Sequence, residues 1–162
     1  MADPLSDVYG RFWELLETES DLTDLVKAGN RLKFDKRNAI KMNLSTIDVP
    51  ELRVVVIGGE PKPRASNLRG WTETYEIGVV TGDQRLEDVF FPLRWALIKA
   101  VHAVETGLIL LDLSDYDGAV TSVNPQSVRD GVSATDEARG IDGWMTFWTV
   151  DVVMKFRPSS LE

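Results

Sequence analysis

The spacing of apolar residues near the amino end predicts two helices. Asp3 and Pro4 are a typical N-cap and first helical residue. Large apolar side chains then recur every three or four positions, at Leu5, Val8, Phe12, Leu15 and Leu16. We therefore expect a helix over residues 4–17 and a shorter one that Ser20 caps and Gly29 ends in a left-handed conformation.

The next patterns predict a β-hairpin. Residues 52–57 are an apolar run rich in valine and closed by two glycines, which is typical of a buried strand. Residues 71–81 alternate between apolar and polar side chains, as a half-buried strand does. We expect these strands to pair. Residues 31–47 carry a weaker pattern, which favours a solvated basic loop and allows a short strand at 32–34.

A long helix with two apolar stripes is predicted after residue 90. One stripe at helical spacing consists of Phe90, Leu93, Leu97, Val101 and Val104. A second stripe beside it consists of Trp95, Ile98 and His102. Such a helix is expected to need cover on more than one side. Pro92 leaves two alternatives open: a kink, or a helix that starts near Phe91 with Pro92 in its first turn.

The carboxyl-terminal part of the chain predicts two more strands. Residues 116–129 have strand character, and Pro125 confines this strand to a sheet edge or a bulge. From residue 144 to residue 156, one parity carries almost only apolar side chains and is expected to face the core. At about 3.3 Å per residue this strand would run roughly 40 Å, so part of it is expected to project beyond the domain body.

Together these elements predict an α+β fold. The expected sheet is mostly antiparallel, has about four to five strands, carries its helices packed on one face, and ends in a long C-terminal β-hairpin. A length of 162 residues suits a single domain over residues 1–162. We expect extended loops at about residues 58–71 and 130–143, which are rich in proline, glycine and charged residues.

Composition argues against several kinds of partner. The formal net charge is -8, so general electrostatic attraction to nucleic acid or to an anionic membrane is not expected. The absence of cysteine removes disulfides, thiolate nucleophiles and Cys-ligated metals. No apolar run approaches the roughly 20 residues of a membrane span, and the first residues lack a secretion pattern. We therefore expect synthesis inside a cell, with no membrane partner.

Candidate catalytic and metal-binding residues are few. His102 lies at helical spacing beside apolar residues, which favours a buried or partly buried structural role over that of a catalytic base. Asp115 and Asp117 resemble half of a calcium loop, but Leu113 stands where the first ligand should be, so a simple turn is favoured. An acidic cluster in the second predicted loop consists of Asp130, Asp136, Glu137 and Asp142. It lacks a partner histidine, so a solvated loop is favoured over a two-metal site. We predict no catalytic residue, no metal and no cofactor.

Five segments, taken in order, have a characteristic layout. They are FWELL at 12–16, SDLTDLV at 20–26, VPELRVVVIG at 49–58, ETYEIGVV at 73–80 and FWTVDVVMKF at 147–156. A long amphipathic helix separates the first four from the last one. In this layout the chain resembles the tail terminator, or tail completion, proteins of long-tailed bacteriophages. The resemblance covers most of the sequence and lies in the order of elements, not in a sharp motif.

The resemblance implies a structural protein of the virion. Such proteins form a ring, expected here to be a homohexamer, that caps the tail tube, ends tail polymerisation and joins the tail to the head connector. The implied partners are further copies of the chain, the tail tube protein and a head–tail connector or neck protein. DNA would pass through the lumen without specific binding. The protein would be assembled in the host cytoplasm and would reside in the tail or neck of the virion, and the family brings no catalytic residues.

Independent of the resemblance, the residues suggest self-assembly. The long helix, the long strand and the two loops present more apolar surface than one core can bury, which points to a protein partner. Arginine and tryptophan are enriched at the centres of interfaces. In and beside the two loops, the candidate subunit or partner contacts are Arg64, Arg69, Trp71, Arg129, Arg139 and Trp144.

Three alternatives stay open. The first is another neck or head-closure protein that joins head and tail, because such proteins share small size, acidity and self-assembly. The second is a small enzyme of unrecognised reaction, and the third is a non-viral binding module. A stable monomer in solution would count against both of the ring-forming classes.

Overall fold

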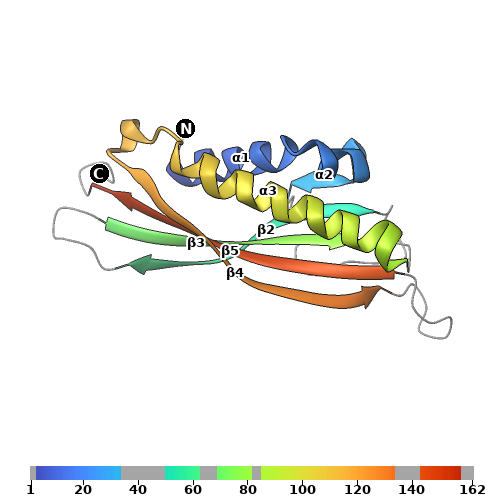
Figure 1. Ribbon diagram of the computed structural model, residues 1–162. Coiled ribbons are helices and arrows are strands. Elements are labelled where there is room, and N and C mark those ends of the chain that lie inside the picture. The colour runs from blue at the N-terminus through green and yellow to red at the C-terminus, as the bar shows by residue number, and fades with distance from the viewer. Residues whose placement is uncertain (1–2, 34–49, 63–68, 82–84, 134–142, 158–162) are drawn as a thin grey trace.

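The computed structural model describes residues 3–33, 50–62, 69–81, 85–133 and 143–157. A long twisted sheet forms one layer, and helices cover one of its faces (Figure 1). The elements in chain order are α1 (Pro4–Glu17), α2 (Ser20–Leu25), a 3-10 turn (Ala28–Asn30), β1 (Arg31–Lys33), β2 (Glu51–Lys62), β3 (Arg69–Val80), a π-helical turn (Leu86–Phe90), α3 (Phe91–Ile109), a second 3-10 turn (Ser114–Tyr116), β4 (Ala119–Ser133) and β5 (Gly143–Phe156). The predicted α+β class is confirmed.

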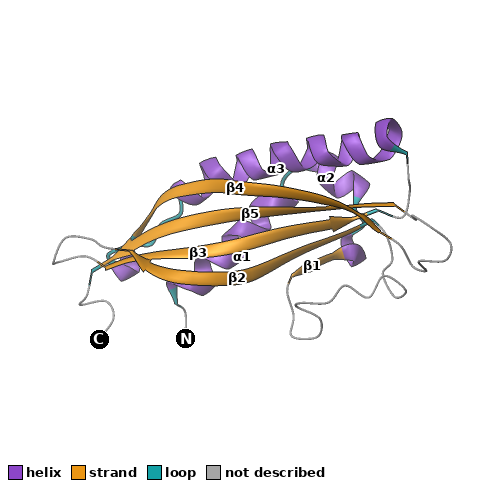
Figure 2. Ribbon diagram, turned by 90° about the horizontal axis from the view of Figure 1, so that it is seen from below, coloured by secondary structure: helices purple, strands orange, loops and turns teal. Residues whose placement is uncertain are grey.

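The described strands form one sheet in the order β1-β2-β3-β5-β4. β1 is parallel to β2, and all other neighbouring strands of this sheet are antiparallel. β1 pairs only with residues 52–54 of β2. One edge of the sheet is therefore β4, and most of the opposite edge is β2 (Figure 2). Both predicted hairpins, β2–β3 and β4–β5, are confirmed.

Local signals explain where the first two helices begin and end. The Ser6 backbone N–H donates to Asp3 Oδ1 at 2.8 Å, which caps α1 as predicted. The cap of α2 is Glu19, not Ser20, because the Glu19 carboxylate accepts from a backbone N–H of its first turn. The prediction for Gly29 is also wrong. α2 has already ended at Leu25, and Gly29 lies inside a 3-10 turn.

The core lies between the helix layer and one face of the sheet. Alternate residues of β5 are buried from Thr146 to Phe156, as the apolar parity predicts. From α1, Phe12 is fully buried, and its ring centroid lies 4.6 Å from that of Tyr75 on β3. Gly118 lies against the Phe156 ring, so that the turn before β4 covers the end of β5. The prediction that β5 projects beyond the domain body is therefore wrong.

β4 has both of the features that Pro125 predicts, an edge position and a bulge. The strand is at the edge of the sheet, and its register with β5 shifts between Pro125 and Ser127. A second shift lies between Val120 and Ser122. A proline lacks the backbone N–H that would donate to a neighbouring strand, so an edge strand with a bulge accommodates it.

The loops predicted at residues 58–71 and 130–143 are shorter than expected. β2 pairs with β3 through Lys62, and β4 pairs with β5 through Ser133. Pro61 is tolerated in β2 because no described strand pairs with the outer side of β2 at that point. Strand pairing therefore overrides the proline and glycine signals of these segments. The stretches between the paired strands lie outside the described residues.

α3 starts at Phe91 with Pro92 in its first turn. Of the two alternatives for Pro92, a kink or a helix start, the structure shows the helix start. The buried side of the helix consists of Leu93, Ala96, Leu97, Ala100, Val101, Val104 and Leu108. These residues face α1, α2 and β4.

Gly107 lets α1 approach α3 closely, because a methyl group at this position would lie 2.4 Å from Leu15 Cδ2. His102 is exposed, so its predicted burial is wrong; it lies on the other side of the helix.

Candidate interaction surfaces

The solvent side of α3 carries a row of exposed apolar residues. Phe91, Trp95 and Ile98 are 50%, 60% and 40% exposed, and Ile109 is 50% exposed. At about 100° per residue these positions fall on one side of the helix, with His102 among them. The row is about 27 Å long at about 1.5 Å per residue. We call these five residues the α3 stripe.

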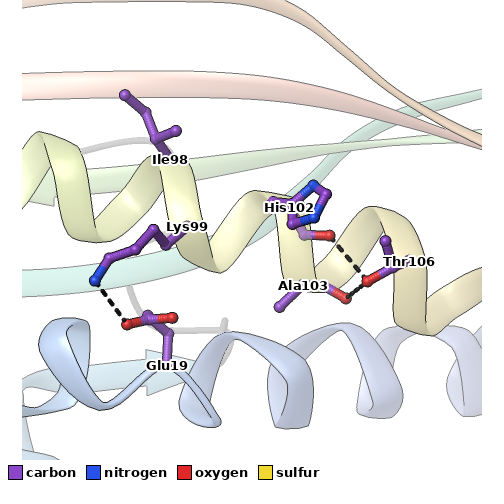
Figure 3. A pocket seen from close by; sticks show the side chains of 6 residues that line it. All are labelled: Glu19, Ile98, Lys99, His102, Ala103 and Thr106. Carbon is purple, nitrogen blue, oxygen red and sulfur yellow. Dashed lines mark hydrogen bonds and ion pairs between the residues drawn. The ribbon is translucent and has the colours of Figure 1, made fainter.

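Ion pairs made by Arg94 and Lys99 hold α3 in the orientation that presents the stripe. The Arg94 guanidinium donates to the Asp130 carboxylate of β4. Toward the helix layer, Lys99 pairs with Asp21 of α2, and its Nζ lies 3.4 Å from Glu19 Oε1 (Figure 3). α3 is thus tied both to the edge strand and to α2. The apolar stripe is a fixed feature of the fold surface.

A shallow groove of about 580 Å³ lies beside the stripe (Figure 3). Its lining residues are Glu19, Ile98, Lys99, His102, Ala103 and Thr106. Among these described residues, the lining contains one hydroxyl group, that of Thr106. This hydroxyl donates to the backbone carbonyls of His102 and Ala103 at 3.1 and 3.2 Å. The hydroxyl thus bonds to its own helix and is not engaged by the His102 ring. The groove has the character of an apolar contact surface with one cation that is already paired.

The pairing of Arg94 with Asp130 makes a testable contribution to stability. The hydrogen bond from Arg94 holds the pKa of Asp130 below its usual value. A lowered folded-state pKa stabilises the fold at neutral pH, and this stabilisation is lost as the pH falls through the folded-state value. Asp130→Asn is expected to lower the free energy of unfolding at pH 7 by up to about 1 kcal/mol, because the carboxylate is partly exposed.

Urea unfolding at neutral and at acidic pH checks this prediction. The difference between Asp130→Asn and the wild type should shrink steadily below the usual aspartate pKa. Asp115→Asn, at an exposed site, is the matched control and should show little effect. An Asp130→Asn difference that stays constant down to the most acidic pH would contradict the ion-pair assignment.

The opposite flank of the sheet presents a second apolar surface. Val56 and Ile57 of β2 are 43% and 50% exposed. The register between β2 and β3 shifts between Val56 and Gly58, so Ile57 is the extra residue of a bulge. Within the described chain, residues 55–62 of β2 have a strand partner on one side only. We call residues 55–62 the β2 edge.

The α3 stripe and the β2 edge lie on opposite flanks of the molecule. Seen from below, α3 runs along the β4 side of the sheet, whereas β2 borders the other side (Figure 2). α1 lies between them over the middle strands, since Tyr9 donates to the Val54 carbonyl at 3.2 Å and its ring stacks on Tyr75. The two apolar surfaces of one molecule therefore do not meet each other.

The structure places the described candidate interface residues at two separate ends of the sheet. Arg64 and Arg139 lie outside the described residues. Arg69 and Trp71 lie where β3 pairs with the last residues of β5, whereas Trp144 lies at the start of β5. These two ends of the sheet are roughly 35 Å apart at about 3.3 Å per residue. The strand ends that flank the two predicted loops accordingly lie at opposite ends of the sheet.

Both predicted tryptophans pack within the fold. Trp71 packs against the core, and its indole N–H donates to the buried Glu73 carboxylate. Gly59 makes room for it, because a Cβ there would lie 2.6 Å from Trp71 Cζ2. The Trp144 ring is 5.5 Å from the Phe90 ring between centroids. Each tryptophan thus has a structural role, and its role as a subunit contact stays a prediction.

The two described arginines among the candidates are exposed. Arg129 lies on the sheet face that α1 and α3 do not cover, where its Nη2 is 3.1 Å from Glu76 Oε2. Its guanidinium carbon lies 5.9 Å from the centroid of the Phe147 ring. Arg69 begins β3 opposite Phe156. Their contact role also stays a prediction.

The acidic segments have local partners in the described chain. Ser114 N–H donates to Asp112 Oδ1 at 2.9 Å, and Asp117 adopts a left-handed conformation with φ of 49°, as in a turn. Asp130 pairs with Arg94, and the other three members of the second acidic cluster lie outside the described residues. Within the described ranges, no group of three or more His, Cys, Asp or Glu side chains is arranged to hold a metal ion.

The sequence signals anticipated one of the two apolar surfaces. The second stripe of the long helix already contained Trp95, Ile98 and His102. The exposed β2 edge was not predicted, because the run at residues 52–57 has the pattern of a buried strand. Only the first half of this run is buried. The two glycines that follow it were the available signal, since glycine inside a strand marks a bulge.

Comparison with known proteins gives a distant structural likeness. No family model matches the chain, and a search of curated proteins found no match. Among solved structures, the chain is similar to one from a structure titled "Virion of native gene transfer agent (GTA) particle". The identity is 14%, 92% of each chain is covered and the TM-score is 0.46. Among the described helices, none is long and apolar enough to cross a membrane.

Proposed function

We propose that this chain is a structural protein of a phage-like virion and works as a tail terminator that assembles into a ring. The observation that carries the proposal is the α3 stripe. One side of α3 belongs to a well-packed core, and the other side offers Trp95, Phe91 and two isoleucines to solvent. A helix that is apolar on all sides is normally covered on all sides. A protein partner supplies the missing cover.

The apolar surface along α3 is large enough to drive association. Leu110, which follows the stripe directly, is 83% exposed. If a large apolar side chain offers about 150–250 Å², the stripe and Leu110 leave roughly 500 Å² of apolar surface uncovered. At about 25 cal/mol per Å² this is roughly 12 kcal/mol of gross transfer free energy, part of which offsets the entropy cost of association.

The order of the elements supports the same class. Two amino-terminal helices, the β2–β3 hairpin, the long helix α3 and the β4–β5 hairpin follow one another as in the tail terminator layout that the sequence resembles. In this proposal the ring, expected to be a homohexamer, caps the tail tube, ends its polymerisation and joins the head connector. It acts by binding its partners and needs neither catalysis nor a cofactor. The net charge of -8 would keep passing DNA from adhering to the lumen.

Co-assembly with tail tube subunits of the same genome tests the proposal. Negative-stain electron microscopy should show tubes of limited length with ring-shaped density at one end when the chain is present. Tubes grown without the chain should be several times longer. A chain that binds an isolated head connector but leaves tube growth unchanged would contradict the terminator proposal and favour a head-closure protein.

A further inference from the structure

We propose that the subunit contact of the ring is formed between opposite flanks, with the α3 stripe of one copy covering the β2 edge of the next. This inference rests on the proposed function, because it names the surfaces through which the copies associate. The occupant of the α3 stripe is then a second copy of this chain. Its contacting part is the β2 edge, with Val56, Ile57 and Gly58 as the apolar centre of the contact.

The positions of the two surfaces support this pairing. One lies on the β4 flank and the other on the β2 flank of the same molecule (Figure 2). A contact between two different patches on opposite flanks repeats from copy to copy, and it closes a ring when the rotation between copies is suitable. A contact of the stripe with another stripe would close a dimer instead and leave Val56 and Ile57 exposed.

The two surfaces also match in length. The α3 stripe extends for about 27 Å along its helix. The eight residues of the β2 edge extend for about 26 Å at about 3.3 Å per residue. Roughly 500 Å² of apolar surface on the α3 side, at an apolar share of about 60%, corresponds to about 800 Å² per partner, which is the standard size of a stable interface.

The chemistry of the two surfaces is complementary. Residues 55–59 of the β2 edge carry no charge, and neither do the four apolar residues of the stripe, as is usual at the centre of an interface. The space in front of Gly58 is open, since an added Cβ would meet nothing within 4 Å. This open position leaves room for the approach of a ring such as that of Trp95. Its indole N–H could donate to a backbone carbonyl on the unpaired side of β2.

Disulfide trapping tests the pairing, because the natural chain contains no cysteine. The double variant Trp95→Cys with Ile57→Cys carries one thiol on each flank. After mild oxidation it should give a ladder of covalent oligomers on a denaturing gel. Each single variant should give no more than a background level of dimer, at least tenfold lower. The pair Asp115→Cys with Ile57→Cys, with one thiol at an exposed site outside the stripe, is the matched control.

The same samples analysed by light scattering separate the failure of this inference from that of the proposed function. Oligomers that do not cross-link in the double variant would overturn the pairing while leaving ring assembly intact. Dimers from Trp95→Cys alone would also overturn it, because they show that the stripe meets its own copy. A monomeric wild type would overturn the ring itself. The pair Ile98→Cys with Val56→Cys replaces the first pair if circular dichroism shows that the first is unfolded.

Discussion

Ile98→Asp is expected to convert the assembled protein into monomers. Ile98 lies in the middle of the α3 stripe and is 40% exposed in the single chain, so a carboxylate there is tolerated by the monomer. In the assembly it would be buried without a partner, which costs several kcal/mol. We expect association to weaken by at least about 100-fold, which corresponds to about 2.7 kcal/mol. Sedimentation velocity over a concentration series measures this change.

Leu5→Asp is the matched control for Ile98→Asp. Leu5 is also a large apolar residue with 40% exposure, but it lies in the first turn of α1 and belongs to neither of the two proposed contact surfaces. A carboxylate near a helix N-terminus is well tolerated. Leu5→Asp should therefore keep the assembly. If the two variants behave alike, whether both assemble or both dissociate, the α3 stripe has no special role.

Phe12→Ala is expected to cost about 3–5 kcal/mol of unfolding free energy, which is the usual range for removing a buried aromatic ring. Phe12 is fully buried, and its ring contacts that of Tyr75 across the interface between α1 and the sheet. Such a loss is a large part of the stability of a domain of this size. The measurement is urea unfolding in the monomeric Ile98→Asp background, where dissociation does not contribute.

Phe91→Ala in the same background provides the comparison. Phe91 is 50% exposed at the start of α3, so its loss should cost less than about 1 kcal/mol in the monomer. In the assembling wild-type background, the same substitution should weaken association. An equal loss of monomer stability for Phe12→Ala and Phe91→Ala would show that α3 is covered in the single chain, contrary to the proposal.

The elements of the fold were largely predictable because their signals are local. Asp3 and Pro4 mark the start of α1, and the alternation along β5 identifies its buried side. Pro125 correctly indicated both an edge strand and a bulge. In each case the residue itself restricts the backbone or its own burial, so a single sequence is enough to predict the outcome.

The errors arise where distant segments decide the outcome. The burial of Val56 and Ile57 depends on whether a further strand lies beyond β2, and β1 turns out to pair with only three residues. The loop at 58–71 is shorter than expected because β3 pairs along it in spite of its prolines. Such cross-strand contacts are set by tertiary packing, which propensity does not encode.

The candidate contacts were predictable only in part. The residue types enriched at interfaces led to Trp71 and Trp144, yet both rings also pack inside the subunit. Trp95 and Ile98 were recognised as a second stripe, but only the structure shows that this stripe stays exposed once α1, α2 and β4 have covered the rest of α3. Residue type identifies which side chains suit a subunit interface, and their burial in the single chain shows which of them remain exposed for such a contact.

The molar mass of the purified wild-type chain in solution, measured by size-exclusion chromatography with multi-angle light scattering, reports directly on whether copies cover each other's apolar flanks. We predict a mass that is an integer multiple, threefold or higher, of 18.1 kDa. Because opposite flanks pair, the particle should close as a ring and not stop at a dimer. A species of 18.1 kDa at every concentration tested would contradict the proposed assembly.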